Sequence, residues 1–431
     1  TVVDESFFNE KASSERKYLG FLIFIKTFPM INSKYVSNCF GQNLMRSIIN
    51  QSMDSKRHLH KISQRVLNSI IKTCETDSKG KLIPTINALL FGSHGSINFD
   101  KLTKSKTTSK LISIKDISNE TLTQLIQLFA SKSEKSDDVR ETHFILDTLL
   151  HIIRNHKSSL SDNTQEVILP LINDLVGLAF FKNDKEPKKQ PKKSDTDDED
   201  DDGDMEKSGQ DLSEIAQERL YSILSELSIV PTGDAHSWQY YTLQDIFKLE
   251  KSTPLKTQLD ESLLEVKQSA LTILNKLSKD KSNKATSRGL EDLLSMCLLQ
   301  LYAGDVDSIS TIEELCEFSK SKKTESLVGV TEIILSLLAQ RKAVLTKTSL
   351  LVWEQFISEV GRDELQVVLN VLPARENKQG FAQLFEGADE YEAVESGEED
   401  GGGEGEGEDE GEDKESEESD DSALEDSEDS T

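Results

Sequence analysis

Four lysines lie close together in the stretch FDKLTKSKTTSKL, residues 99–111. Their ammonium groups, and the hydroxyls of the Ser and Thr residues between them, are suited to binding phosphate oxygens. No aromatic residue lies between the lysines to stack on a base, so contacts would be made to the backbone of a nucleic acid and not to its sequence. The predicted binding residues are Lys101, Lys104, Lys106 and Lys110. The alternative is a solvated surface loop.

A second group of lysines lies in the stretch KNDKEPKKQPKKSDTDDEDDDGDMEKSGQ, residues 182–210. This mixture of Pro, Lys and Asp is typical of a disordered insertion. The basic half resembles a nuclear localisation element, or alternatively a charge cluster that only keeps the segment soluble. Ser194 and Thr196 precede acidic residues, as acidophilic kinase sites do, so phosphorylation there would add negative charge. The lysines of the basic half are Lys185, Lys188, Lys189, Lys192 and Lys193.

Reactive side chains do not converge in a pattern that we associate with catalysis. His58 and His60 form the only close histidine pair, and a spacing of two places them on different faces of a helix. Nucleotidyl transfer requires two metal ions held by carboxylates on a rigid element. The dense carboxylates of this chain lie instead in flexible, glycine-interspersed tracts. We therefore expect neither an active site nor a cofactor.

The cysteines and the apolar runs indicate which compartment the protein occupies and whether it spans a membrane. Cys39, Cys74, Cys297 and Cys316 lie far apart and form no C-x-x-C pair, which favours a reducing compartment over a disulfide framework or zinc site. The most apolar run, residues 19–25, is far shorter than the roughly 18 residues that a membrane span needs. We expect no membrane contact. Because the sequence starts at Thr1 and stops inside an acidic run, we also expect it to be part of a longer protein.

Charge is distributed unevenly along the chain. The formal charge is −28 over 431 residues, yet residues 386–431 alone hold 24 Asp and Glu against one Lys. Residues 1–190 are net basic, with 27 Lys and Arg against 20 Asp and Glu. This asymmetry indicates a basic surface that meets a polyanion, and a separate acidic tail for interactions. An ordinary set of solvated, lysine-rich helix faces is the alternative for the basic half.

Helices must position these groups. In residues 54–75 the apolar positions recur at steps of three, four, one, three and four, which is one face of an amphipathic helix. Similar patterns recur in residues 139–155, 211–227, 260–277, 288–302 and 324–340. We predict an all-α fold, a HEAT/armadillo-like α-solenoid, with a globular helical bundle as the alternative. The face in residues 54–75 consists of Leu59, Ile62, Val66, Leu67, Ile70 and Cys74.

The same patterns divide the chain into four parts. Residues 1–181 are predicted as a net basic helical-repeat region, and 182–210 as the disordered Lys/Asp-rich insertion. Helical repeats resume over 211–386, and residues 387–431 form a disordered acidic tail. Because amphipathic helices resume directly after the insertion, we expect it to be a loop extruded from one continuous solenoid.

The second helical region ends in the stretch VLPARENKQGFAQLFE, residues 371–386. Pro373 cannot continue a helix, and Asn377 is suited to cap a last short one. Phe381, Leu384 and Phe385 fall at helical spacing and would pack that helix onto the preceding repeat. We predict a structural lid, with a direct binding motif as the alternative.

Four segments, residues 43–67, 89–107, 216–227 and 369–386, together resemble the DNA polymerase phi family, the fungal polymerase V-like proteins related to Myb-binding protein 1A. The resemblance implies a nucleolar helical-repeat protein associated with ribosomal DNA, ribosomal RNA synthesis and large-subunit assembly. The family name also implies a DNA polymerase, for which these residues offer no support. The most specific signature is R-E-N-x-x-G-x-x-x-L-F, carried here by Arg375, Glu376, Asn377, Gly380, Phe381, Leu384 and Phe385.

These observations predict a non-enzymatic scaffold of the nucleus and nucleolus that acts in ribosomal DNA transcription and ribosome biogenesis. The expected partners are ribosomal DNA or pre-rRNA, basic ribosomal proteins or histones, and pre-ribosomal assembly proteins. A template-directed DNA polymerase is one alternative, and a histone or ribosomal-protein chaperone that acts through the acidic tail is another. The tail would also compete with nucleic acid for the basic surface, as an autoinhibitory switch.

Overall fold

The computed structural model describes residues 2–133, 138–160, 164–182, 212–233, 236–258, 260–279, 284–320 and 327–371. All of them belong to one compact unit, Thr1–Leu372. The four-part division of the chain therefore stays a prediction. Several predicted features lie outside these ranges: the lysine cluster of Lys185, Lys188, Lys189, Lys192 and Lys193, the candidate phosphorylation sites Ser194 and Thr196, and the signature residues Arg375, Glu376, Asn377, Gly380, Phe381, Leu384 and Phe385.

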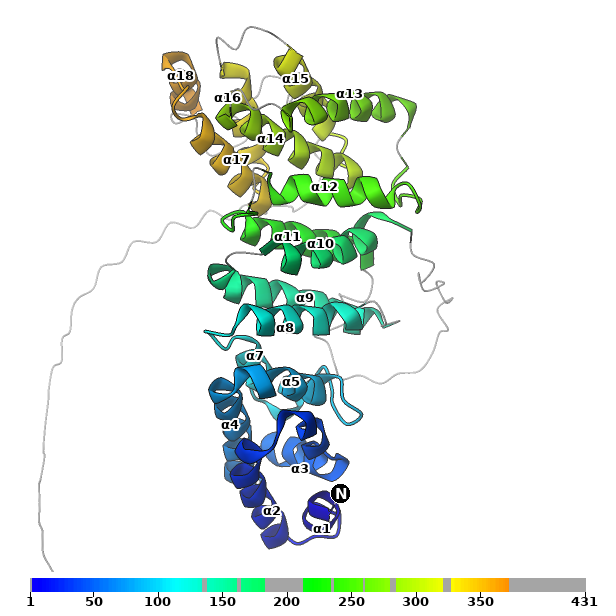
Figure 1. The fold of residues 1–431 in the computed structure, drawn as a ribbon, viewed down its shortest axis with the longest axis vertical. Helices are drawn as coiled ribbons and strands as arrows, with labels where there is room; N and C mark the ends of the chain where they lie inside the picture. Colours follow the sequence, from blue (N-terminus) through cyan, green and yellow to red (C-terminus); the bar gives the residue numbers. More distant parts are fainter. Residues whose placement is uncertain are drawn as a thin grey trace, which may run out of the picture. The chain divides into compact units, whose positions relative to one another are not determined.

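The described residues form an all-helical protein, which confirms the predicted class (Figure 1). Their only β-type contact is an isolated antiparallel bridge between Phe181 and Leu255. The α-helices are α1 Val2–Phe7, α2 Ser14–Thr27, α3 Gln42–Ser52, α4 His60–Thr76, α5 Ile83–Leu90, α6 Phe99–Thr103, α7 Thr107–Ile112, α8 Asn119–Ser133, α9 Val139–His156, α10 Thr164–Phe180, α11 Leu212–Leu227, α12 Trp238–Leu249, α13 Glu261–Leu277, α14 Lys284–Tyr302, α15 Ser308–Lys320, α16 Val328–Ala339, α17 Ala343–Phe356 and α18 Arg362–Val371.

Helix α4 organises the N-terminal part. It packs against α2, α3 and α7, and a π-helical turn, η4 Ser78–Leu82, follows it directly. All six residues of the predicted apolar face are buried, from Leu59 at 5% exposed to Cys74 at 0%. Aromatic side chains complete this core, with the rings of Phe24 and Phe28 stacked 5.0 Å apart. The periodicity of the sequence therefore identified the buried face correctly.

Helices α8 to α12 pack in succession (Figure 1). Helix α8 contacts α5 and α9, α9 contacts α11, α11 contacts α10, and α10 contacts α12. Asp138 caps the N-terminus of α9, where its side chain accepts a hydrogen bond from the backbone N–H of Arg140 at 2.9 Å. Although the segment between them is long, α10, which ends at Phe180, and α11, which begins at Leu212, pack directly on each other.

Helix α14 forms the centre of the C-terminal part, where α12, α13, α15 and α17 all pack against it. Leu293, Leu298 and Leu299 are fully buried, and so is Cys297. Residues 289–302 of α14 are all buried, so neighbouring helices enclose this part of the helix on every side. Helices α16, α17 and α18 then extend the packing to residue 371.

Candidate functional site

The lysine segment, residues 99–111, is not the loop expected from its composition. It forms two short helices, α6 and α7, joined by a tight turn. Asp100 holds them together, because its carboxylate accepts hydrogen bonds from the backbone N–H groups of Thr108 at 2.9 Å and Ser109 at 3.0 Å. Phe99 and Leu111 are fully buried beneath the two helices. The burial of Phe99 and Leu111 and the Asp100 cap thus make this segment helical, although its composition is typical of a solvated loop.

The structure brings the four predicted lysines onto this one helix–turn–helix. Lys101 lies on α6 and Lys110 on α7, while Lys104 and Lys106 lie in and beside the turn. All four residues are exposed to solvent. Lys104 adopts a left-handed backbone conformation with φ of 46°, which ends α6 and reverses the chain. One short, capped element therefore presents four lysines on the surface.

The threonine hydroxyl groups of the same segment do not face solvent as expected. Thr103, Thr107 and Thr108 are buried. The Oγ of Ser105 lies 2.8 Å from the Oγ1 of Thr103 and 2.9 Å from that of Thr107, so the three hydroxyls form a hydrogen-bonded chain. These groups stabilise the turn and are not available as donors to a ligand. Any phosphate contact here would be made by the lysines.

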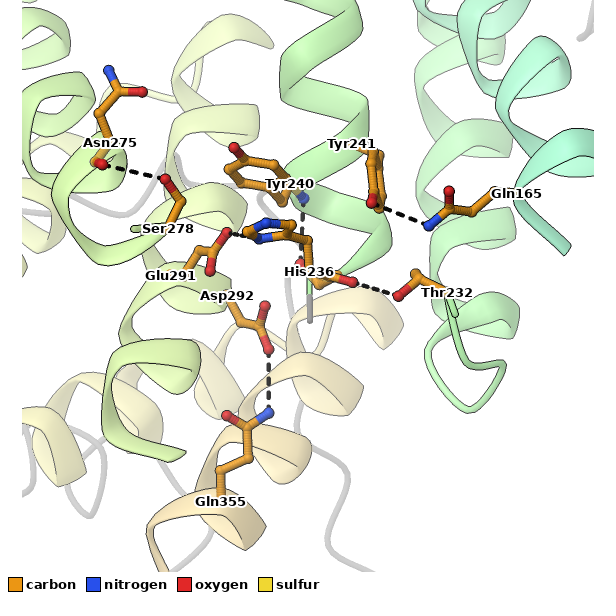
Figure 2. A network of polar contacts seen from close by, with 11 residues as sticks. Gln165, Thr232, His236, Tyr240, Tyr241, Asn275, Ser278, Glu291, Asp292 and Gln355 are labelled. Carbon is orange, nitrogen blue, oxygen red and sulfur yellow. Dashed lines mark hydrogen bonds and ion pairs between the residues drawn. The ribbon is translucent and has the colours of Figure 1, made fainter. Parts of the chain in front are cut away.

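A buried polar network lies where α12, α14 and α17 meet, and sequence reasoning missed it (Figure 2). The Nδ1 atom of His236 lies 2.6 Å from Oε1 of Glu291, and the His236 ring stacks on Tyr240 with 4.3 Å between centroids. Asp292 accepts a hydrogen bond from Nε2 of Gln355 at 3.3 Å. The one available signal was the pair Glu291 and Asp292 directly before the apolar run of α14.

The two acids of this network lie in an environment that disfavours their charge. Burial raises the pKa of Glu291, against the hydrogen bond and the charge of His236. Burial also raises the pKa of Asp292, opposed by hydrogen bonds from Ser237 and Gln355. Asp292 is 7% exposed, and its Oδ1 atom has no partner among the described residues. The arrangement links three helices through polar contacts to two buried acids.

The described ranges hold no group of three His, Cys, Asp or Glu side chains that could bind a metal ion. The cysteines are free thiols, and burial raises the pKa of Cys74 to about 11 and that of Cys297 to about 12. Such thiols are unreactive at neutral pH. Within the same ranges, the helices are too short or too polar to span a bilayer.

The described part of the chain thus defines a class of protein: an all-helical protein with exposed lysines on a short helical turn and a polar junction inside its core. The chain belongs to the DNA polymerase phi family, whose sequence model matches residues 1–431. This confirms the resemblance drawn from its segments.

Two curated relatives are similar along most of the chain. It is 51% identical over 400 residues to the rDNA transcriptional regulator POL5 of Saccharomyces cerevisiae, which covers 91% of this chain and 37% of the relative. It is 27% identical over 422 residues to the rDNA transcriptional regulator pol5 of Schizosaccharomyces pombe, covering 90% of this chain and 42% of the relative. The chain therefore spans less than half the length of these relatives. No solved structure matches it.

Proposed function

We propose that this chain is the helical scaffold of a regulator of ribosomal DNA transcription, acting without catalysis of its own. The observation that carries the proposal is the 51% identity to a budding-yeast protein named for that role, over 91% of the chain. The role of the whole protein is part of the proposal, because the relatives are more than twice as long.

The scaffold is of the HEAT/armadillo-like solenoid type. Its support is the succession of neighbouring packed helices from α8 to α12. Stacked helix pairs present an extended surface, in which each pair contacts mainly its neighbours. Such a surface suits the assembly of several partners side by side. Those partners would be pre-ribosomal assembly proteins, which links the transcription role to ribosome biogenesis.

Contact with nucleic acid is assigned to the exposed lysines of α6, α7 and their turn. Lys101, Lys104, Lys106 and Lys110 project ammonium groups from an element that Asp100 holds in place. Lysine contacts to phosphates carry no sequence information, so ribosomal DNA and pre-rRNA are both suitable ligands. The lysines at positions 185–193 would direct the protein to the nucleus, and ligand binding would concentrate it in the nucleolus.

The acidic tail, residues 387–431, would bind basic ribosomal proteins or histones. It holds 23 Asp and Glu against one Lys, and so accounts for most of the chain's net charge of −28. A polyanion tethered to a basic surface is present at high effective concentration, so it would also compete with nucleic acid for the lysines. The proposal therefore includes an autoinhibitory role for the tail.

Crosslinking followed by mass spectrometry and sequencing, applied to the full-length protein in cells, tests this function. Crosslinks from α6 and α7 to ribosomal DNA or pre-rRNA, together with protein crosslinks to assembly factors, are the expected result. Crosslinks confined to the acidic tail and histones would overturn the scaffold in favour of a chaperone. Primer extension by the purified protein, lost on changing one carboxylate pair, would overturn it in favour of the polymerase that the family name suggests.

A further inference from the structure

A groove of about 540 Å³ lies along the polar side of α4. One wall comes from α2 and the 3-10 turn η1, Phe28–Met30, through Ile25 and Pro29. The other side and the floor come from α4 and η4. The remaining lining residues are Arg65, Asn68, Ser69, Lys72, Thr73, Thr76, Asp77 and Lys81. This groove is separate from the α6–α7 lysines, and the sequence analysis did not identify it.

Lys81 contributes a buried positive charge to the groove. This residue is only 3% exposed, and its Nζ atom donates hydrogen bonds to the backbone carbonyls of Phe28, at 3.0 Å, and Pro29. No carboxylate of the described residues forms an ion pair with it, so its charge is offset by the two carbonyl dipoles and by the Phe28 ring, whose centroid lies 5.8 Å from Nζ. A buried ammonium without an anionic partner is costly, and an anion in the groove would reduce that cost.

Arg65 and Lys72 extend the positive charge along the groove. They lie seven residues apart on the same face of α4, which separates them by roughly 10 Å along the helix axis. Neither is in an ion pair with a carboxylate of the described chain, in contrast to Lys79, which pairs with Glu120 at 3.0 Å. This length is greater than one phosphate group needs and suits a chain of linked phosphates.

The carboxylate that lines the groove does not neutralise it. Asp77 accepts a hydrogen bond from the backbone N–H of Gly80 at 3.0 Å and so caps η4. The lining therefore carries three cationic side chains and one carboxylate, a net charge of +2. Asn68, Ser69 and Thr76 add neutral donors between the charges. Charge and hydrogen-bond donors together match a phosphodiester backbone.

Exposed apolar and aromatic groups follow the groove wall in the chain. Met30, next to Pro29, is 85% exposed, and Tyr35, in the 3-10 turn Ser33–Tyr35, is 51% exposed. The Nζ atom of Lys34 lies 4.7 Å from the centroid of the Tyr35 ring. Aromatic faces beside cations are the means by which proteins hold unpaired bases.

We propose that the α4 groove, with Arg65, Lys72 and Lys81, binds the backbone of a single-stranded nucleic acid, and that Tyr35 offers a stacking face for one of its bases. The inference rests on the proposed function and names a second site for the same class of ligand. Single-stranded RNA and DNA share the chemistry that the groove recognises. Under the proposed function, the single strand that binds in the groove is the nascent transcript.

The test measures binding of short labelled oligouridylate and oligothymidylate to the full-length protein over a series of salt concentrations. Arg65→Glu with Lys72→Glu should weaken binding at least about tenfold and lower the slope of log K against log salt by about 1.4, or 0.7 for each lost contact. Tyr35→Ala should weaken it roughly tenfold with no change in slope. Lys276→Glu with Lys279→Glu is the matched control, because it reverses two charges outside the groove and should leave the slope unaltered.

Lys81→Met removes the buried charge and is checked for folding by circular dichroism. Because Arg65 and Lys72 are exposed, their double variant tests the groove even where the substitution of Lys81 prevents folding. The inference is overturned if the groove double variant binds the oligonucleotides as tightly as the control pair does. It is also overturned if the wild type prefers duplex DNA or a peptide of residues 387–431.

The failure of the groove and the failure of the proposed function give different results. If the groove double variant is unaffected while charge reversal at Lys101, Lys104, Lys106 and Lys110 abolishes binding, the groove fails and the proposed function stands. If the groove double variant loses binding, but the protein forms no crosslinks to ribosomal DNA or its transcripts in cells, the groove stands and the proposed function fails.

Discussion

The carboxylate of Asp100, on α6, accepts a hydrogen bond from the backbone N–H of Thr108, in the first turn of α7, at 2.9 Å. This bond satisfies a donor that the helix itself cannot pair, and it ties two short helices into one unit. The lysines that we assign to phosphate binding are presented by that unit. Their arrangement therefore depends on an acidic residue whose carboxylate is engaged by Thr108 and Ser109 of α7.

Replacing Asp100 with Ala should lower the free energy of unfolding by about 1 kcal/mol, the usual loss when a capping side chain is removed. Asp100→Asn retains an acceptor and should lose less. Urea denaturation measures both, and hydrogen exchange of the α7 amides localises the effect. If the α7 amides exchange as slowly in Asp100→Ala as in the wild type, the Asp100 cap does not hold this element together.

Neutralising the four lysines of α6, α7 and their turn should weaken nucleic-acid binding and flatten its salt dependence. With Lys101, Lys104, Lys106 and Lys110 all changed to Gln, the slope of log K against log salt for a single-stranded probe should fall by about 2.8, or 0.7 for each contact. The same four positions changed to Arg keep their charge and serve as the control. A slope that does not change in the Gln variant would remove these lysines from the interface.

Two helical glycines should respond to Ala in opposite directions. A Cβ on Gly289 of α14 would lie 2.8 Å from the ring of Phe356 on α17, so Gly289→Ala should cost about 1–3 kcal/mol through overpacking. A Cβ on Gly177 of α10 would meet nothing within 4 Å, and Gly177→Ala should stabilise the protein by about 0.5–1 kcal/mol. Urea unfolding of the two variants gives both signs. Equal stabilities would refute the close approach of α14 and α17.

The polar junction should make stability depend on pH through Asp292. Its pKa is raised from the ordinary value of 3.8 by burial, so the folded state binds more protons than the unfolded state between that value and the raised one. Stability must fall as pH rises through this window. Asp292→Asn cannot ionise, so it should flatten this part of the curve and be relatively more stable at neutral pH. Thermal unfolding at a series of pH values tests the sign.

Asp260 provides the control of opposite sign for that experiment. It caps α13, and the hydrogen bond from the backbone N–H of Leu263, at 2.9 Å, lowers the pKa of its carboxyl below 3.8. Its contribution is therefore present above pH 3.8 and is lost as pH falls through the lowered value. Asp260→Asn should lose stability at neutral pH, where Asp292→Asn gains it. If both variants shift stability in the same direction, the assigned environment of Asp292 is wrong.

Deleting residues 387–431 should raise the affinity of the protein for RNA. The tail carries a dense negative charge on the same chain as the lysines, and a tethered competitor of this kind would lower apparent affinity most strongly at low salt. Replacing the tail with a neutral Gly/Ser segment of equal length controls for its bulk. Equal RNA affinities with and without the acidic residues would exclude autoinhibition.

The sequence by itself determined the helical class and much of the core. The apolar face of α4 was predicted residue by residue. This prediction depends on a local rule, since helical periodicity involves residues only a few positions apart. The family was also recognisable, because its signature segments occur in order along the chain.

Only the tertiary structure decided what the polar residues do. Composition marked residues 99–111 as a loop, but contacts from Asp100 to Thr108 and the burial of Phe99 and Leu111 make it helical. Nothing next to Lys81 in the sequence shows that its ammonium lies under a groove, because the carbonyls that hold it come from Phe28 and Pro29, about 50 positions earlier. Likewise, Glu291 meets His236 across 55 residues. Burial and charge environment are set by partners distant in the chain, and a single sequence records its neighbours along the backbone, not its neighbours in space.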